Sequence, residues 1–357
     1  MLVLLKNVKC VFTMVLRGRV ICIFFTVYLL LICPLVFSRP FMTNLNSTNI
    51  IIIDDFHPIF MEKLSNASFN VKYFPNISDQ EAIKEIHKYD IVAVRSKINF
   101  TSNLLAQFPN LKCIARGGAG MDNIDENAAL KQNITLLNAP EGNRDAVAEH
   151  AIGLLLALSN NIVKSHNEVL NNQWLREDNR GFEIGEKTIG IIGYGNTGKA
   201  FAQKIKSFKV KILAHDKYAN VKEEENIKNA TLNEIQEYAD IITLHIPLTI
   251  ETKEYINYSF LEKCTKPIVL INTSRGKVID TKAIILGFEK KQLIAFGTDV
   301  LENEKINNYD KDEILIFNEL KKNKNILITP HIAGWTKESY QKIAEILANK
   351  LIKFKTK

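Results

Sequence analysis

The sequence predicts an α/β fold built from two doubly wound parallel-sheet domains. Apolar runs such as 50–53 are continuous rather than alternating, which is typical of parallel strands that are buried on both faces. Helical patterns alternate with these runs along the chain, and one run leads into a glycine-rich turn. The length of 357 residues suits two domains at roughly 150 residues each.

The elements are expected in the following order. Strands are predicted at 50–53, 90–94 and 111–115, with helices near 79–88 and 101–107 and a glycine-rich loop after the third strand. One long helix is predicted over 145–170, with Asp145 as its cap and an apolar stripe along it. From 188 the alternation restarts, with a helix at 197–206, a final helix at 336–354, and strands at 188–192, 210–214, 240–244, 267–271, 293–297 and 326–328.

Residues 1–48 form an N-terminal extension of different composition. Five of the seven net positive charges lie before the first acidic residue, Asp54. The run 20–37 is apolar and flanked by arginines, and its length suits either a membrane anchor or an export signal. A third interpretation, which we favour, is that translation starts at Met42, so that the first strand follows a short leader. Membrane association is expected only if 20–37 is translated.

The rest of the chain carries a net charge of only +2, because five of the seven charges belong to the extension. This excess is too small to predict a basic face for nucleic acid. Cys113 and Cys264 stand far apart in this part of the chain, so we expect neither a disulfide framework nor a metal site.

The glycine-rich turn is Gly193-Tyr194-Gly195-Asn196-Thr197-Gly198. It follows a predicted strand and opens a predicted helix, the context of a dinucleotide-binding turn. Gly193 makes the turn, Gly195 admits a diphosphate and Gly198 permits close packing, while the amides of Asn196 and Thr197 hold the diphosphate. Asp216 ends the next strand, where a carboxylate accepts from the ribose hydroxyls and favours NAD over NADP.

Three further polar residues, Arg275, Glu304 and His331, stand in loops that follow predicted strands. Oxidation of a 2-hydroxy acid needs a base for the hydroxyl proton, and histidine titrates near neutral pH. A carboxylate can orient that histidine, and an arginine can hold the substrate carboxylate. The carboxyl ends of parallel strands share one edge, so we expect these residues to meet there.

From about residue 50 to 350 the chain resembles the D-isomer-specific 2-hydroxyacid dehydrogenases. The matching segments are the glycine-rich turn, 272–280 (NTSRGKVID), 297–304 (GTDVLENE) and 329–334 (TPHIAG). The resemblance implies that Arg275, Glu304 and His331 are catalytic and that NAD is the cofactor. It also implies a Rossmann NAD-binding domain at 149–332 inserted in a flavodoxin-like substrate domain at 49–148 and 333–357. The cofactor contacts that the resemblance implies beside the glycine-rich turn are Ala119, Asp216, Thr273, Ser274, Asp299, His331 and Gly334.

Within this family the chain looks most like the D-3-phosphoglycerate dehydrogenases, through 94–96 (VRS), 116–125 (RGGAGMDNID) and 138–143 (NAPEGN). Arg95 and Ser96 follow a predicted strand and suit a terminal phosphate, and the amides of 117–120 suit a carboxylate. Trp335 departs from the resemblance, because these enzymes usually carry a small residue there. No C-terminal regulatory domain is expected after Lys357. The predicted substrate contacts are Arg95, Ser96, Gly118, Ala119, Asn123 and Arg275.

These observations predict NAD-dependent oxidation of D-3-phosphoglycerate to 3-phosphohydroxypyruvate, the first step towards serine, in the cytoplasm. A glyoxylate, hydroxypyruvate or D-lactate type of reductase is the nearest alternative. An NAD(H)-sensing binding protein is a more distant one. A homodimer is predicted through the apolar helix at 145–170, unless that helix is buried between the two domains of one chain.

Overall fold

The computed structural model describes residues 12–16, 19–23 and 48–356. In the first part, β1 (Phe12–Leu16) pairs antiparallel with β2 (Arg19–Ile23). The apolar run 20–37 lies outside the described residues apart from 20–23, which belong to β2, so its interpretation stays a prediction.

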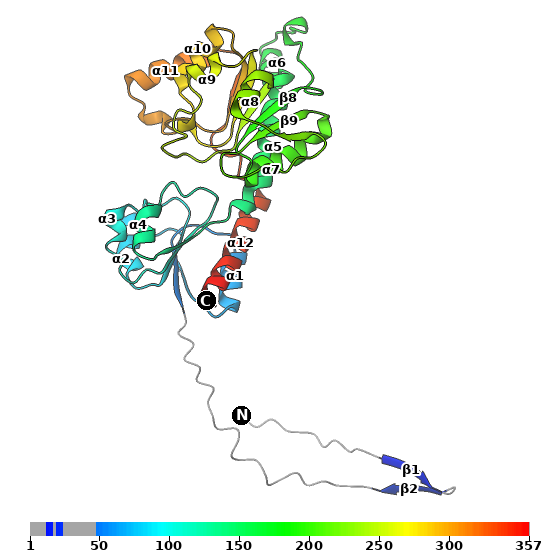
Figure 1. Ribbon diagram of the computed structural model, residues 1–357. Helices are drawn as coiled ribbons and strands as arrows, with labels where there is room; N and C mark the ends of the chain where they lie inside the picture. The colour runs from blue at the N-terminus through cyan, green and yellow to red at the C-terminus, as the bar shows by residue number, and fades with distance from the viewer. Residues whose placement is uncertain (1–11, 17–18, 24–47, 357) are drawn as a thin grey trace. The chain divides into compact units, whose positions relative to one another are not determined.

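The first sheet of the body is parallel throughout, with the strand order β4-β3-β5-β6-β7. This is the order of flavodoxin-like folds and agrees with the predicted fold class. Ile50 and Ile52 lie in one hydrophobic cluster and Ile51 and Ile53 in another, which shows that both faces are covered. Its strands are β3 (Asn49–Ile52), β4 (Asn70–Tyr73), β5 (Ile91–Val94), β6 (Cys113–Arg116) and β7 (Thr135–Leu137), and its helices are α1 (Ile59–Asn66), α2 (Asp79–Ile86), α3 (Ser102–Leu105) and α4 (Glu126–Lys131) (Figure 1).

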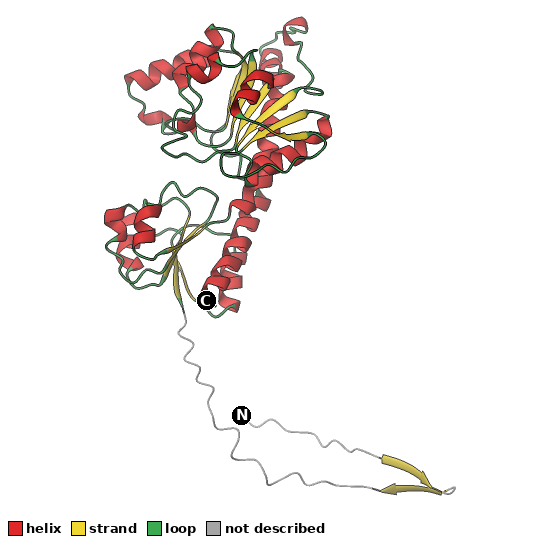
Figure 2. Ribbon diagram, viewed as in Figure 1, coloured by secondary structure: helices red, strands yellow, loops and turns green. Residues whose placement is uncertain are grey.

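The second sheet has seven parallel strands in the order β10-β9-β8-β11-β12-β13-β14, with helices along its faces (Figure 2). The order reverses direction between β8 and β11, the place where ligands bind in open α/β sheets. The strands are β8 (Thr188–Ile192), β9 (Lys211–His215), β10 (Ile227–Asn229), β11 (Ile241–Leu244), β12 (Ile268–Asn272), β13 (Leu293–Thr298) and β14 (Ile326–Ile328). The helices are α7 (Asn196–Ile205), α8 (Leu232–Tyr238), α9 (Tyr258–Glu262), α10 (Thr281–Glu289) and α11 (Lys311–Lys322).

The single helix predicted over 145–170 is wrong. The structure has α5 (Pro140–Ser159) and α6 (Ile162–Leu170), which are bent by 59°. Asp145 is not the cap, because α5 already begins at Pro140. The break comes at two asparagines: the Asn160 amide donates to the carbonyl of Leu156 at 3.1 Å, and Asn161 takes a φ of +52°. Asparagine tolerates this left-handed conformation, which ends the hydrogen-bond ladder of α5.

The last helix, α12 (Lys337–Lys355), contacts both α1 and α5 (Figure 1). Leu347 and Leu351 are fully buried with Ile50 and Ile52 of β3. The C-terminal segment thus packs on the first sheet; the exact domain boundaries stay a prediction.

Among the described helices, none is by itself long and apolar enough to cross a membrane. The bent pair α5 and α6 passes that test together by length and composition alone. In α5, Ala151, Leu154 and Leu155 are buried in the core against β8 and β12. The apolar run 151–158 of this helix therefore packs largely against the core of the chain.

Candidate active site

A cavity of about 760 Å³ lies where loops from the carboxyl ends of both sheets face each other. Its wall combines the loops after β5 and β6 with those after β12, β13 and β14, so segments far apart in the sequence meet here. Of the residues singled out from the sequence, it is lined by Arg95, Ser96, Gly118, Ala119, Asn196, Thr197, Thr273, Ser274, Arg275, Asp299, Glu304, His331 and Gly334.

A neighbouring cavity of about 470 Å³ lies at the switch point of the second sheet, between the loops after β8, β9 and β11. Gly193 has a φ of +93°, which favours glycine, and a Cβ added at Gly195 would meet open space. Gly198 lies in α7 against the carbonyl of Gly193, a contact that a side chain would block. The conformation of Gly193 and the close packing of Gly198 thus fit the roles predicted for them, and the role of Gly195 stays a prediction.

The surrounding polar atoms fit a dinucleotide. Asn196 and Thr197 are the first two residues of α7, so their amides have no partner within the helix. Among the buried side-chain atoms that lack a hydrogen-bond partner in the described part of the chain are Oγ1 of Thr273 and Nδ1 of His245. Both residues line the larger cavity, and buried polar atoms of this kind are normally satisfied. The residues present therefore suit NAD.

Asp216 is held firmly at the edge of the smaller cavity. One carboxylate oxygen accepts from the amide of Tyr194 at 2.8 Å, and the other accepts from those of Tyr218 and Ala219. Burial opposes ionisation, but these bonds outweigh it, so the pKa of Asp216 is lowered. The neighbouring Lys217 pairs with Glu251 across the rim. Asp216 is therefore a fixed negative charge, and the lysine beside it is already engaged.

His331 and Glu304 form a pair in the larger cavity. Nδ1 of His331 lies 2.9 Å from a carboxylate oxygen of Glu304, and both side chains are about half exposed. The hydrogen bond to Glu304 raises the pKa of His331, against the smaller effect of desolvation. Because Nδ1 is engaged, Nε2 is the nitrogen left to exchange a proton with a substrate.

The turn that carries His331 is held by Asp299, which is 1% exposed. Its carboxylate accepts from the hydroxyl of Thr329 at 2.6 Å and from the amides of Ile332 and Ala333 at 2.9 and 2.7 Å. His331 itself has a φ of +54°, a conformation that is strained for a residue with a side chain. Asp299 thus stabilises the backbone that presents the imidazole.

Arg275 lies just after β12 and is oriented by Asp122, a residue that the sequence analysis did not select. Nε and Nη2 of Arg275 donate to the carboxylate of Asp122, at 3.0 and 2.7 Å, and Nη1 donates to the carbonyl of Ser274. Burial would raise the pKa of Asp122, but the bonds and charge of Arg275 lower it overall. Of the five N–H groups of the guanidinium, two remain for a ligand.

Two more guanidiniums line the same cavity. Arg95 follows β5, and Arg116, also missed from the sequence, is the last residue of β6. Among the described residues neither has a side-chain hydrogen bond or ion pair within 4.0 Å, and Nε of Arg116 is buried without a partner. Burial lowers the pKa of both, but arginine remains charged. Within residues 48–356, neither of these two guanidiniums therefore has a carboxylate at ion-pair distance.

Besides Gly198, Asn123 is the predicted site residue that lines neither cavity. Its side-chain amide donates to the carbonyl of Ile98 at 2.9 Å and so holds the loop beside β5. Asp54, which was not predicted as a site residue, also holds this loop. One of its carboxylate oxygens accepts from the backbone amides of Arg95 at 2.6 Å and Ser96 at 3.2 Å. A carboxylate directly after a strand, as at Asp54, is the signal that could have identified it.

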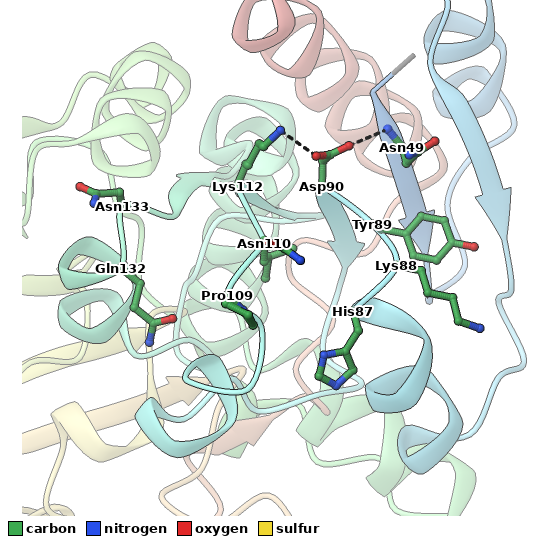
Figure 3. A pocket seen from close by; sticks show the side chains of 11 residues that line it. Asn49, His87, Lys88, Tyr89, Asp90, Pro109, Asn110, Lys112, Gln132 and Asn133 are labelled. Carbon is green, nitrogen blue, oxygen red and sulfur yellow. Dashed lines mark hydrogen bonds and ion pairs between the residues drawn. The ribbon is translucent and has the colours of Figure 1, made fainter. Parts of the chain in front are cut away.

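A further cavity of about 510 Å³ opens at the amino ends of β3, β5 and β6, the opposite edge of the first sheet (Figure 3). Its central carboxylate, Asp90, accepts from the amide of Asn49 at 3.1 Å and pairs with Lys112 at 2.8 Å. The Asp90 carboxylate is thus already paired with a backbone amide and a lysine of the chain.

Residues 152–333 match the family model described as the D-isomer specific 2-hydroxyacid dehydrogenase, NAD binding domain. A D-3-phosphoglycerate dehydrogenase of Archaeoglobus fulgidus is 33% identical over 77% of this chain and 51% of its own length. A hydroxypyruvate reductase of Thermotoga maritima is 32% identical over 78% of this chain and 89% of its own. The chain therefore spans about half the length of the phosphoglycerate dehydrogenases that it matches first.

Solved structures agree with this likeness. A D-lactate dehydrogenase of Aquifex aeolicus, complexed with NAD and lactic acid, has a TM-score of 0.75 and 27% identity, over 86% of this chain and 95% of that chain. The family match, the relatives and the fold point the same way: the chain belongs to the D-isomer-specific 2-hydroxyacid dehydrogenases and carries their NAD-binding domain.

Proposed function

We propose that the protein oxidises D-3-phosphoglycerate to 3-phosphohydroxypyruvate with NAD⁺, the reaction that begins serine synthesis. The observation that carries this proposal is the pair of free guanidiniums, Arg95 and Arg116, in the same cavity as His331 and Arg275. A substrate with one carboxylate needs one such group. Because this cavity offers three arginines and Asp122 pairs with only one of them, it suits a substrate with a second anionic group.

The catalytic roles that we propose follow from the contacts of each side chain. Nε2 of His331 takes the C2 hydroxyl proton, while Nδ1 remains bonded to Glu304, which stabilises the imidazolium that forms. Arg275, held by Asp122, donates its remaining N–H groups to the substrate carboxylate and to the oxygen on C2. Bound NAD would supply the acceptor for the hydride from C2, so that His331 has only the proton to take.

The amides of Asn196 and Thr197 bind the diphosphate in this proposal, and Asp216 binds the ribose. Thr273, Ser274 and the loop at 117–120 complete the space between the cofactor and the substrate. Asp299 holds the His331 turn rather than touching the reacting atoms, because its oxygens are engaged by that turn.

A substrate panel tests the proposal. With NADH, 3-phosphohydroxypyruvate is compared with hydroxypyruvate, glyoxylate and pyruvate, in the wild type and in Arg95→Ala. We expect kcat/KM to be highest for the phosphorylated substrate and that advantage to be lost in the variant. Arg144→Ala, on α5 and outside the cavity, is the control and is expected to change neither value. Equal or better use of the unphosphorylated acids by the wild type would contradict the proposal.

The nearest alternative is a reductase for hydroxypyruvate or glyoxylate. It is favoured by the relatives that bear those names, of which this chain covers 89% and 83%. The same panel decides between the two.

An NAD(H)-sensing protein is a weaker candidate, because it would not need the His331–Glu304 pair. His331→Ala is expected to lose turnover while it still binds NADH, and retained turnover would remove His331 from the mechanism.

We also propose a homodimer and keep the cytoplasmic location predicted from the sequence. The prediction of a dimer rested on the apolar run 151–158, but three of its residues are buried in the core of this chain and three more pack against that core. The support now comes from α6, which has no buried residue, and from the loop that follows it. Six exposed apolar side chains form this surface, which we call the α6 patch: Ile162, Val163, Val169, Leu170, Trp174 and Leu175.

A further inference from the structure

Trp335 lies over the guanidinium of Arg95, at the wall of the larger cavity. The guanidinium carbon is 4.3 Å from the centre of the Trp335 ring, within the range of a cation–π contact. Trp335 is 63% exposed, so this contact is made by a large aromatic side chain that is not buried in the core. Trp335 comes four residues after His331 in the same turn, and therefore joins that turn to the loop after β5.

A second aromatic ring also lies close to the guanidinium of Arg95. The ring of Tyr340, on α12, has its centre 5.6 Å from the guanidinium carbon. Its hydroxyl donates to Asp55 at 2.5 Å, and Tyr73 donates to the other oxygen of Asp55 at 3.1 Å. Asp55, which also accepts from Tyr73, therefore holds the Tyr340 hydroxyl in place beside Arg95.

The backbone of Arg95 is fixed as well, because its amide donates to Asp54 at 2.6 Å. Within residues 48–356 the side chain makes no hydrogen bond and no ion pair. The aromatic rings of Trp335 and Tyr340 are thus its close partners, and the N–H groups along the edge of the guanidinium are left for a ligand. A guanidinium that contacts aromatic faces still has its in-plane N–H groups available to a ligand. A guanidinium that pairs with a carboxylate uses those N–H groups in the pair.

We propose that Trp335 is the residue that sets the preference for substrates with a second anionic group, by holding Arg95 with its donors towards the cavity. The inference rests on the proposed function and names the residue through which the substrate is selected. Trp335 acts through Arg95 and is a positioning residue. Trp335 lies in the same turn as His331. The turn therefore sets the distance between the group that binds the second anion and the imidazole that exchanges the proton.

The first test is kinetic and uses a matched pair of substrates, 3-phosphohydroxypyruvate and hydroxypyruvate, which differ only in the phosphate. In Trp335→Ala we expect KM for the phosphorylated substrate to rise by about tenfold, the size of one cation–π contact, with little change in kcat. For hydroxypyruvate we expect less than about a twofold change in kcat/KM, because no second anion needs Arg95. Trp335→Phe should restore most of the loss.

A double-variant comparison shows whether Trp335 acts through Arg95. In an Arg95→Ala background, Trp335→Ala should add almost nothing to the loss for the phosphorylated substrate. Equal losses for both substrates in Trp335→Ala, or a full further loss in the double variant, would show a merely structural role and overturn the inference.

The second test needs no turnover. The chain has two tryptophans, so Trp174→Phe leaves Trp335 as the single indole reporter. We expect inorganic phosphate and D-3-phosphoglycerate to change its fluorescence in a saturable way, and Arg95→Ala to abolish the change. A signal that is absent, or that survives in Arg95→Ala, overturns the inference. Preference of the wild type for hydroxypyruvate would instead overturn the proposed function, so the two failures are distinguishable.

Discussion

At the scale of single residues, the chemistry of the cavity depends on what each carboxylate is bonded to. Glu304 bonds the imidazole of His331, Asp122 bonds the guanidinium of Arg275, and Asp299 bonds backbone amides. Residue type alone does not separate these roles. Each follows from the partner that the fold brings within hydrogen-bond distance.

The His331–Glu304 pair makes the pH dependence of turnover a test. Reduction of a 2-oxo acid needs the protonated imidazole, so the rate should fall as pH rises through the raised pKa of His331. Oxidation needs the neutral form and should show the opposite slope. In Glu304→Gln the charge that raises this pKa is lost, so both midpoints should move to lower pH, by about one unit. The measurement is kcat/KM against pH in both directions. Midpoints that stay in place would show that the pair does not form in the enzyme at work.

Asp216 makes a prediction about cofactor choice. A 2′-phosphate would meet its fixed carboxylate and lose the ribose hydrogen bonds, each effect costing about 1–3 kcal/mol. We expect kcat/KM to favour NADH over NADPH by about a hundredfold or more, because tenfold is about 1.4 kcal/mol. Asp216→Ala should remove most of the preference, and Glu251→Gln, which frees Lys217, a smaller part of it. Near-equal use of both cofactors by the wild type would show that Asp216 does not face the ribose.

At the scale of elements, the turn between β14 and α12 does the most for the site. It carries His331 in a left-handed conformation and also carries Trp335, and it is held by a carboxylate from the end of β13. The motif at 329–334 was recognised from the sequence, but its dependence on Asp299 was not. Hydrogen bonds between residues about thirty positions apart leave no local pattern.

Replacing Asp299 should therefore weaken both the fold and the activity. Asn in place of Asp299 keeps one acceptor but points an N–H group at a donor of the turn, which costs about 1–3 kcal/mol. We expect the free energy of unfolding, measured with urea, to fall by about that amount, and kcat to fall with it. Asp178→Asn, at an exposed position in a short 3-10 helix, is the control and should change neither. An unchanged unfolding curve for Asp299→Asn would mean that the turn is held by other contacts.

At the scale of the whole molecule, the α6 patch is the feature that indicates an interface with a second copy of the chain. Six apolar side chains on one helix and the following loop are exposed, two of them by more than two thirds: Leu170 at 69% and Trp174 at 82%. Exposed apolar surface gathered in one place marks an interface more often than scattered residues do.

We expect light scattering to give a dimeric mass for the full chain at micromolar concentration. The double variant Leu170→Glu with Trp174→Glu should shift it to a monomer, because burying two charges would oppose association. Leu315→Glu, which changes a similarly exposed leucine on α11, is the control and should leave the dimer intact. A monomeric wild type would contradict the proposal.

The sequence by itself determined the fold class and the main residues of the site. Continuous apolar runs are a local signal for buried parallel strands, and the predicted strands agree with the structure to within two residues at each end. The glycine-rich turn and the motifs of Arg275, Glu304 and His331 are local signals too. The fold class is confirmed, and Arg275, Glu304 and His331 line one cavity as expected, because the residues that specify each feature are neighbours in the chain; the roles of these side chains stay a proposal.

The tertiary structure decided what depends on contacts between distant segments. It showed that Asp122 orients Arg275, that Arg116 lines the cavity, and that Trp335 lies on Arg95. It also divided the helix predicted over 145–170, where helical periodicity alone did not show that Asn161 would take a left-handed conformation. Pairing, burial and the direction of a side chain depend on which loops meet at the sheet edge, and chain neighbours do not specify that.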